Sequence, residues 1–324
     1  MRVLAHRRLA CAIAIGAIAT GVALAQQDSA PGGLRHARLY EIASSKTLNN
    51  VNRNDVQAAL KVWAELMGQQ RGFLLETKVD VLDTVAEMVA RLESRSVDAM
   101  VICVTEFMEL EARRLVVPVF TNGRRAQGDA HYSYLVVVKG SSTATGIAGL
   151  RGTNILVSSR TLENAGIAWL DVMLGKEGLG RASSFFASMK SVDKAQACIL
   201  PVFFGAAEAC IVDEVNLDLA KEMNPQLGQL TVLARSRPML ENVVAIPVDP
   251  HPYTNEWKQA MLTAQDSPRG RQILSVFKTE RVVPLHPGDL DSARDLWRDY
   301  FRLPGSAPNK TPVAPGMKGP IITR

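Results

Sequence analysis

Residues 85–106, VAEMVARLESRSVDAMVICVTE, decide the fold class of this chain of 324 residues. Val85, Val89 and Leu92 recur at helical spacing, and after a short turn the apolar run AMVICV predicts a buried strand. Residues 194–214, KAQACILPVFFGAAEACIVDE, repeat this order of helix, turn, strand and polar ending. We therefore expect an α/β protein with two lobes of similar construction.

The same alternation of helix and strand continues on both sides of these two units. Pro201 interrupts one of the expected helices and should kink it. Short apolar strands between helices favour mostly parallel sheets that are covered by helices on both faces. We expect helices over 54–67, 81–92, 162–174 and 192–204, and strands over 38–42, 73–79, 99–104, 115–120, 132–138, 154–157, 185–189, 209–212, 230–234 and 243–248.

The two ends of the chain do not fit this alternation. The amino end has a basic head, an apolar run over 9–22 and the small-residue pattern Ala23-Leu24-Ala25, which together indicate a secretory signal peptide cleaved after Ala25. The apolar run is shorter than the roughly 20 residues that a membrane-spanning helix needs. We therefore expect residues 1–25 to be removed and the mature protein to be periplasmic. Residues 304–324 carry five prolines among small and polar residues, which predicts a disordered tail.

Charge and cysteine content narrow the classes of function. The formal charge of +5 falls to +2 when the three arginines of the leader are removed, which argues against a nucleic-acid-binding face. Cys103 lies in an apolar strand, a poor place for a reactive thiolate. Cys198 and Cys210 flank a helix-to-strand turn, and they either form a disulfide in an oxidising compartment or are simply small buried residues.

Signatures of catalysis and of metal binding are missing from the sequence. The histidines are scattered without the paired spacing of a zinc site, and neither a phosphate-binding loop nor a nucleophile elbow is present. We therefore expect a protein that is not an enzyme and that has no metal or other cofactor. An enzyme on the same fold would have only Cys103 or Glu106 as weak candidates for its reactive group.

A series of short motifs in the second half of the chain points to a family. They are VVVKGS at 136–141, IAGLRG at 147–152, SSRT at 158–161, SVDKA at 191–195, VFFG at 202–205, EACIVD at 208–213 and MNPQLG at 223–228. In this order, behind a signal peptide, the series resembles the phosphate/phosphite/phosphonate-binding proteins of ABC importers. The resemblance extends over roughly residues 35 to 285 and includes the helix and turn at 267–277.

This resemblance implies a type II periplasmic-binding-protein fold. Two mostly parallel sheets with flanking helices would form two lobes, joined by a hinge where the chain crosses near 132–138 and near 235–244. Lobe one would contain residues 35–134 and 242–301, and lobe two residues 135–241. The ligand of such proteins is held between the lobes, which close around it.

The resemblance also implies a ligand-binding loop at the start of lobe two. In the family, hydroxyl groups and backbone N–H groups of this loop hold the phosphonate oxygens, as the amino end of a helix can. The corresponding residues are Ser158, Ser159, Arg160 and Thr161, of which Arg160 is not part of the family motif. Arg160 either grips an oxyanion with its guanidinium or is solvated, with Ser159 or Thr161 serving as a helix cap.

Further candidates follow other strands, at the edges where open α/β sheets bind ligands. A carboxylate there selects a protonated oxyanion or an ammonium group on the ligand, because it only accepts hydrogen bonds. Alternatively, it is a helix cap or the partner of a lysine that closes the lobes. Lys46 is either a charged ligand contact or a surface lysine. The candidates are Ser44, Lys46, Thr105, Glu106, Ser191 and Asp213, with Ser191 expected near the start of a helix.

Taken with the resemblance, these residues predict a periplasmic solute-binding protein. It would capture a small anionic, phosphate-like or phosphonate-like ligand for the permease of an ABC importer in the inner membrane, and it would act as a monomer. The alternative is a periplasmic ligand-sensing module that signals to a membrane receptor. The sequence does not separate the two, because they share one fold and differ at the surface.

Overall fold

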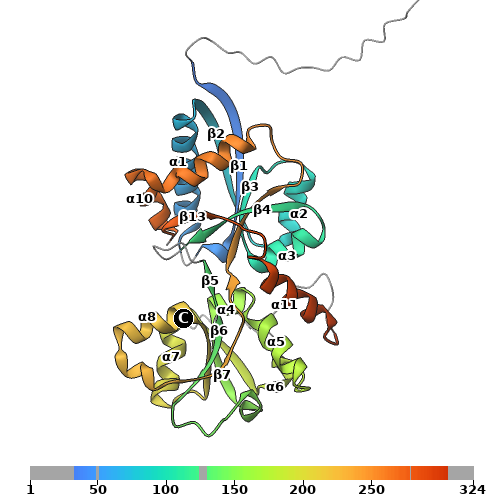
Figure 1. Ribbon diagram of the computed structural model, residues 1–324, viewed down its shortest axis with the longest axis vertical. Coiled ribbons are helices and arrows are strands. Elements are labelled where there is room, and N and C mark those ends of the chain that lie inside the picture. The colour runs from blue at the N-terminus through green and yellow to red at the C-terminus, as the bar shows by residue number, and fades with distance from the viewer. Residues whose placement is uncertain (1–32, 49–50, 124–129, 278, 306–324) are drawn as a thin grey trace, which may run out of the picture.

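The computed structural model describes residues 33–48, 51–123, 130–277 and 279–305, and its parts form two lobes that meet at a waist (Figure 1). The predicted signal peptide at 1–25 and nearly all of the predicted tail at 304–324 lie outside the described residues. The α/β architecture predicted from the sequence is confirmed. The sheets are mixed rather than mostly parallel, because the strands that cross between the lobes pair antiparallel with their neighbours.

Lobe one is built on a mixed sheet, in which β1 is parallel to both β2 and β3 and β12 is inserted antiparallel between β3 and β4. Its strand order is β13 (Arg281–Pro284), β4 (Val116–Gly123), β12 (Asn242–Pro247), β3 (Ala99–Cys103), β1 (Arg35–Ser44) and β2 (Phe73–Leu82). The helices packed on it are α1 (Arg53–Gln70), α2 (Val85–Glu93), α3 (Val104–Ala112), α9 (Thr254–Thr263) and α10 (Pro268–Val276).

Lobe two repeats this plan with a smaller sheet, where β7 is parallel to β8 and β9 and the crossing strand β6 is antiparallel to β9. Its order is β10 (Thr231–Arg235), β6 (Tyr134–Val138), β9 (Ala209–Asp213), β7 (Asn154–Ser158) and β8 (Ser188–Val192). The sheet is flanked by α4 (Ser159–Glu163), α5 (Gly166–Lys176), α6 (Ala182–Phe185), α7 (Ala195–Phe204) and α8 (Glu214–Met223).

The chain passes between the lobes at a small antiparallel sheet. In it β5 (His131–Tyr132) pairs with β11 (Met239–Leu240), and β6 and β12 continue from these strands into the two lobes. This pairing holds the two crossings side by side, so the waist is the expected hinge, and both crossings fall where the sequence places them.

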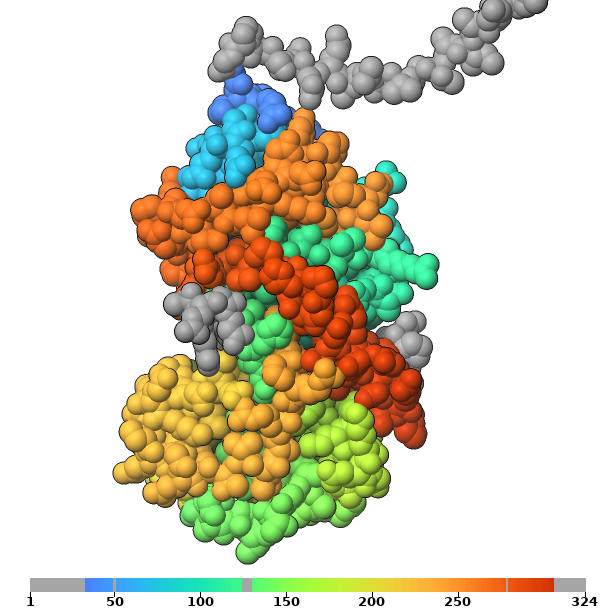
Figure 2. Space-filling model, viewed as in Figure 1, coloured from blue at the N-terminus to red at the C-terminus, as the bar shows by residue number. Residues whose placement is uncertain are grey.

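A helix that the sequence analysis did not anticipate lies across both lobes. α11 (Asp291–Arg302) packs on α5 of lobe two and also contacts α3 of lobe one, and it extends across the waist in the space-filling view (Figure 2). Arg294 of α11 bonds Glu111 at 2.6 and 3.1 Å, and Asp299 pairs with Lys176 at 2.6 Å. The boundaries of the lobes stay a prediction, but this part of the segment 242–301 is shared between them.

The single helix expected over 162–174 is broken in two, and packing explains the break. α4 ends at Glu163 and α5 begins at Gly166, with Asn164 in an extended conformation between them. A Cβ atom on Gly166 would lie 2.3 Å from Thr161, so only glycine permits this close approach. The Tyr134 hydroxyl accepts a hydrogen bond from the freed Ala165 N–H at 3.1 Å.

Two further boundaries differ from the expectation for local reasons. The strand expected at 185–189 is β8, at Ser188–Val192, because Phe185 and Phe186 are buried by α6 and its end rather than by the sheet. α2 starts at Val85 instead of residue 81, because Thr84 and Glu87 form a capping box that fixes the first turn.

The two candidate disulfide cysteines lie inside lobe two. Cys198 of α7 and Cys210 of β9 are joined by a disulfide, with their Cα atoms 5.5 Å apart, and both are fully buried. Pro201 lies inside the same helix. The bond therefore ties α7 to the middle of the sheet, close to the position where proline weakens the helix.

Candidate functional site

The candidate residues gather where strand ends of the two lobes face each other at the waist. Lys46 follows β1 in lobe one, and it interacts electrostatically with Glu163, which ends α4 in lobe two. The carboxyl ends of β1 and β7, with those of their neighbours β3 and β9, therefore lie on the facing sides of the two lobes, and we call the region between them the cleft. Open α/β sheets bind ligands at such edges.

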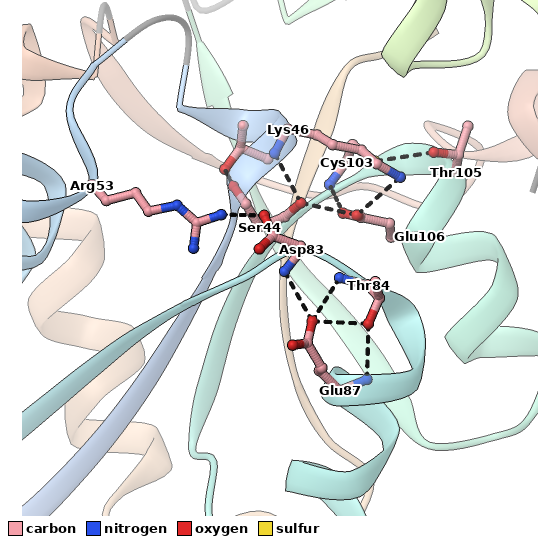
Figure 3. Close-up of polar contacts among 10 residues, drawn as sticks. Ser44, Lys46, Arg53, Asp83, Thr84, Glu87, Cys103, Thr105 and Glu106 are labelled. Carbon is pink, nitrogen blue, oxygen red and sulfur yellow. Dashed lines mark hydrogen bonds and ion pairs between the residues drawn. The ribbon is translucent and has the colours of Figure 1, made fainter. Parts of the chain in front are cut away.

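Glu106 is the centre of the cluster in lobe one. Its side chain is fully buried in the first turn of α3, where Oε1 accepts a hydrogen bond from Ser44 Oγ at 2.9 Å and lies 3.3 Å from Lys46 Nζ. Its Oε2 accepts the backbone N–H of Cys103 at 3.1 Å (Figure 3). A buried carboxylate with three partners is satisfied by the protein itself. Glu106 therefore positions Lys46 rather than facing the cleft.

Lys46 is the residue of this cluster that reaches the cleft. Its side chain keeps 25% of its exposure. Burial disfavours the charged ammonium, but the attraction of Glu106 and Glu163 outweighs burial and raises the pKa of Lys46 above its ordinary value. Lys46 thus carries a full positive charge and is held in place by its ion pair with the buried Glu106.

Thr105 and Cys103 do not face the cleft in this conformation. Thr105 is 1% exposed, and its Oγ1 lies 3.0 Å from Cys103 Sγ. Burial, together with the negative charge of Glu106, raises the pKa of Cys103 far above that of an ordinary thiol. The thiol stays neutral, so this cysteine lacks the activation that a nucleophile needs.

The hydroxyl groups of the lobe-two loop bond mainly to the loop itself. Ser158 is the N-cap of α4, and its Oγ lies 2.8 Å from Thr161 Oγ1, with both residues buried. Ser159 is more accessible and donates a long hydrogen bond of 3.4 Å to the carbonyl of Asp193. The cap is thus Ser158, not Ser159 or Thr161, and Ser159 is the hydroxyl that is held most weakly.

Arg160 is not solvated, because its guanidinium is paired inside the protein. Its guanidinium forms an ion pair with Glu241, which lies between the hinge strand β11 and β12. Both residues line a cavity of about 60 Å³ at the waist, together with Asp213. Asp213 is the N-cap of α8 and accepts hydrogen bonds from Asn216 N at 2.9 Å and Asn216 Nδ2 at 2.6 Å.

Ser191 does not open a helix, which corrects the expectation from the sequence. It lies within β8, opposite Val157 of β7, and α7 begins only at Ala195, with Lys194 as its N-cap. Among the described residues, no side-chain hydrogen bond joins Ser191 to another candidate. β8 extends farther than expected because Asp193, not Ser191, sits at the turn that leaves the sheet.

Sequence reasoning missed acidic residues that belong to the cleft. Glu163 lies on its surface, and the partial burial of the carboxyl group together with nearby Asp193 raises the pKa of Glu163, against the attraction of Lys46. Glu241 holds Arg160 from the hinge. Glu163 could have been found from the sequence, because it closely follows the SSRT motif. Glu241 could not, because its pairing with Arg160 depends on the folded arrangement of the two crossings.

Two hinged lobes with a polar cleft between them define a solute-binding protein. The model of the family "ABC transporter, phosphonate, periplasmic substrate-binding protein" matches residues 46–290, and the chain belongs to this family. The resemblance inferred from the sequence is therefore confirmed. A comparison with curated protein sequences finds no match.

Solved structures of low sequence identity share the fold. A Xanthomonas citri protein bound to chloride has a TM-score of 0.62 and 16% identity, over 82% of this chain and 98% of that one. A binding-protein component of a Pseudomonas aeruginosa ABC phosphonate transporter gives 0.56 and 12%, over 81% and 86%. PhnD1 from Prochlorococcus marinus, in complex with methylphosphonate, gives 0.56 and 14%, over 82% and 99%.

These matches confirm the type II periplasmic-binding-protein fold and place the chain in a periplasmic, substrate-binding family. Within the described ranges, no helix has the length and apolar character needed to cross a membrane. In those same ranges, no group of His, Cys, Asp and Glu is arranged to hold a metal ion.

Proposed function

We propose that this protein captures a phosphonate, or a closely related phosphorus oxyanion, in the cleft and delivers it to an inner-membrane ABC permease. The family supports transport over sensing as the role of the ligand site. The observation that carries the proposal is the charged Lys46 at the cleft, held by the buried Glu106. The protein acts by binding rather than by catalysis, as a monomer, after removal of residues 1–25, and it needs no cofactor.

Lys46 is the principal contact to the ligand in this proposal. Its ammonium is close enough to Glu163 of lobe two for the two charges to attract each other. The oxygens of a phosphonate that enters between them would accept charge-assisted hydrogen bonds from the Lys46 ammonium. Because Glu106 and Ser44 fix the lysine from behind, little side-chain entropy is lost when the ligand binds.

Contacts from lobe two come from the exposed part of the SSRT loop. Ser159 is held only by a long hydrogen bond, so it is free to turn toward an oxyanion. Arg160 would join by exchanging its partner Glu241 for the ligand as the lobes close. Ser158, Thr161, Thr105 and Asp213 keep the loop and helix ends in place, so we assign them supporting roles. Ser191 is left without a role.

Isothermal titration calorimetry with phosphate, phosphite, methylphosphonate, 2-aminoethylphosphonate and sulfate tests this proposal. We expect saturable binding of at least one phosphorus oxyanion and none of sulfate. Lys46→Ala should weaken that binding at least about tenfold, which corresponds to roughly 1.4 kcal/mol. Lys61→Ala is the matched control, because Lys61 is an exposed lysine of lobe one that pairs with Glu65 on the surface of α1.

Two results would contradict the proposed function, each at a different point. If no phosphorus oxyanion binds the wild-type protein, the ligand class is wrong. If one binds and Lys46→Ala binds it equally well, the ligand class stands but the site is elsewhere.

A further inference from the structure

Glu163 differs from the other acidic residues at the waist in having no fixed partner. Glu106 and Asp213 each accept hydrogen bonds at both carboxylate oxygens, and Glu241 is held in an ion pair. Within the described ranges, the carboxylate of Glu163 forms neither a hydrogen bond nor an ion pair. It is therefore an acceptor that remains available to a ligand.

The backbone places this carboxylate beside the weakly held hydroxyl of the lobe-two loop. Glu163 is the last residue of α4, the short helix of lobe two next to the waist (Figure 1). It follows Ser159 by four positions in this helix, so the two side chains lie on the same face. Glu163 is exposed, and Ser159 is partly exposed. A ligand that reaches Ser159 therefore also comes close to Glu163.

On the other side of the cleft, Lys46 attracts Glu163. Partial burial raises the pKa of Glu163, and the attraction of Lys46 opposes this shift. The ammonium of Lys46 already lies 3.3 Å from a carboxylate oxygen of Glu106. Glu163 is thus a second carboxylate near a single ammonium group, and this part of the cleft carries a surplus of negative charge.

An anion that binds Lys46 must be compatible with the Glu163 carboxylate. Two unprotonated anions at close range repel each other, unless a proton lies between them. A phosphonate can supply this proton, because its second ionisation falls near neutral pH, like that of a phosphate ester with its pKa of about 6. The protonated oxygen can donate to a carboxylate while the other oxygens accept from Lys46. Sulfate has no proton to donate at neutral pH.

We propose that Glu163 is a specificity-determining residue, which accepts a hydrogen bond from the protonated oxygen of the ligand while Lys46 holds the other oxygens. This inference rests on the proposed function and narrows it to phosphorus oxyanions that keep one ionisable P–OH group near neutral pH. Methylphosphonate and hydrogen phosphate meet this requirement. Sulfate does not, and neither does a phosphonate monoester, because its remaining acid group is fully ionised.

Isothermal titration calorimetry of the full chain with methylphosphonate, its monomethyl ester and sulfate tests this inference. Wild type should bind methylphosphonate at least about a hundredfold more tightly than either of the other anions. Glu163→Gln keeps the size of the side chain but adds N–H donors, so the preference over sulfate should fall at least about tenfold. Glu177→Gln is the matched control, because it changes an exposed glutamate just after the far end of α5.

Proton uptake provides a measurement that a merely structural role of Glu163 would not affect. Titrations at about pH 8, in buffers with different ionisation enthalpies, count the protons taken up when methylphosphonate binds. The free ligand has largely lost its second proton at this pH, so wild type should take up about one proton per ligand. Glu163→Gln should take up clearly less, whereas Glu177→Gln should match wild type.

The outcomes separate this inference from the proposed function. If no phosphorus oxyanion binds wild type, the proposed function is wrong and the inference falls with it. If methylphosphonate binds, the inference alone is overturned when wild type binds sulfate or the ester equally well. It is also overturned when Glu163→Gln retains either the preference or the proton uptake of wild type. The variant should fold, because Glu163 is exposed and its carboxylate bonds to no other described residue.

Discussion

Two buried glutamates of lobe one show how the same side chain serves different purposes. Glu106 has partners for both oxygens and sits in the first turn of α3, where the helix dipole also favours negative charge. Glu41 lies in the middle of β1 and has a partner for only one oxygen. The first is a settled support for Lys46, and the second is a titratable group inside the protein.

Glu41 makes the stability of the protein depend on pH. Its pKa is about 7 in the folded state and 4.5 when unperturbed, so the folded state binds more protons between these values. Stability therefore falls as pH rises through this window, by about 3 kcal/mol for this group, since one unit is worth about 1.4 kcal/mol. Urea unfolding of Glu41→Gln should lack this loss, so the variant gains stability relative to wild type between about pH 4 and about pH 8.

Equal pH profiles for wild type and Glu41→Gln would contradict this prediction. Glu65→Gln is the control, because it makes the same substitution at a carboxylate that pairs with Lys61 at the surface.

At the scale of elements, the sequence predicts most strands and helices, but local packing sets several boundaries. The strand at 99–104 is recognisable because its apolar run stands alone, whereas Phe185 and Phe186 suggest a strand and in fact fill the core at α6. The break before Gly166 depends on the approach of Thr161, which no periodicity reveals. The charged α11 was missed because its apolar face has meaning only against α5 and α3.

α11 should restrain the movement of the lobes through Arg294. This residue is bonded to Glu111 of lobe one, while its helix packs on lobe two. Arg294→Ala should lower the free energy of unfolding by less than about 1 kcal/mol, because the pair is partly exposed. Its effect on local opening should be larger, with faster hydrogen exchange in α11 and at the hinge.

The control is Arg298→Ala, since Arg298 pairs with Asp295 of the same helix, and Asp295 keeps its second partner Arg237 when Arg298 is removed. Equal exchange rates in the two variants would show that α11 does not couple the lobes through Arg294.

At the scale of the whole molecule, the two-lobed fold follows from the sequence, and the cleft follows only in part. Polar residues after β1, β3, β7 and β9 predict the candidate site, because parallel strands end at one edge. The individual roles depend on contacts across sixty or more residues, such as Ser44 with Glu106 and Arg160 with Glu241. Those pairings arise from the hinge and the packing of the lobes, so single motifs do not disclose them.

The most direct test of the central claim is small-angle X-ray scattering of the protein with and without saturating methylphosphonate. A solute-binding protein that closes on this ligand becomes more compact, so the radius of gyration should fall when the ligand is added. The change should be absent with sulfate and should need more ligand in Lys46→Ala. An unchanged scattering curve at a concentration where calorimetry shows saturation would contradict capture by lobe closure.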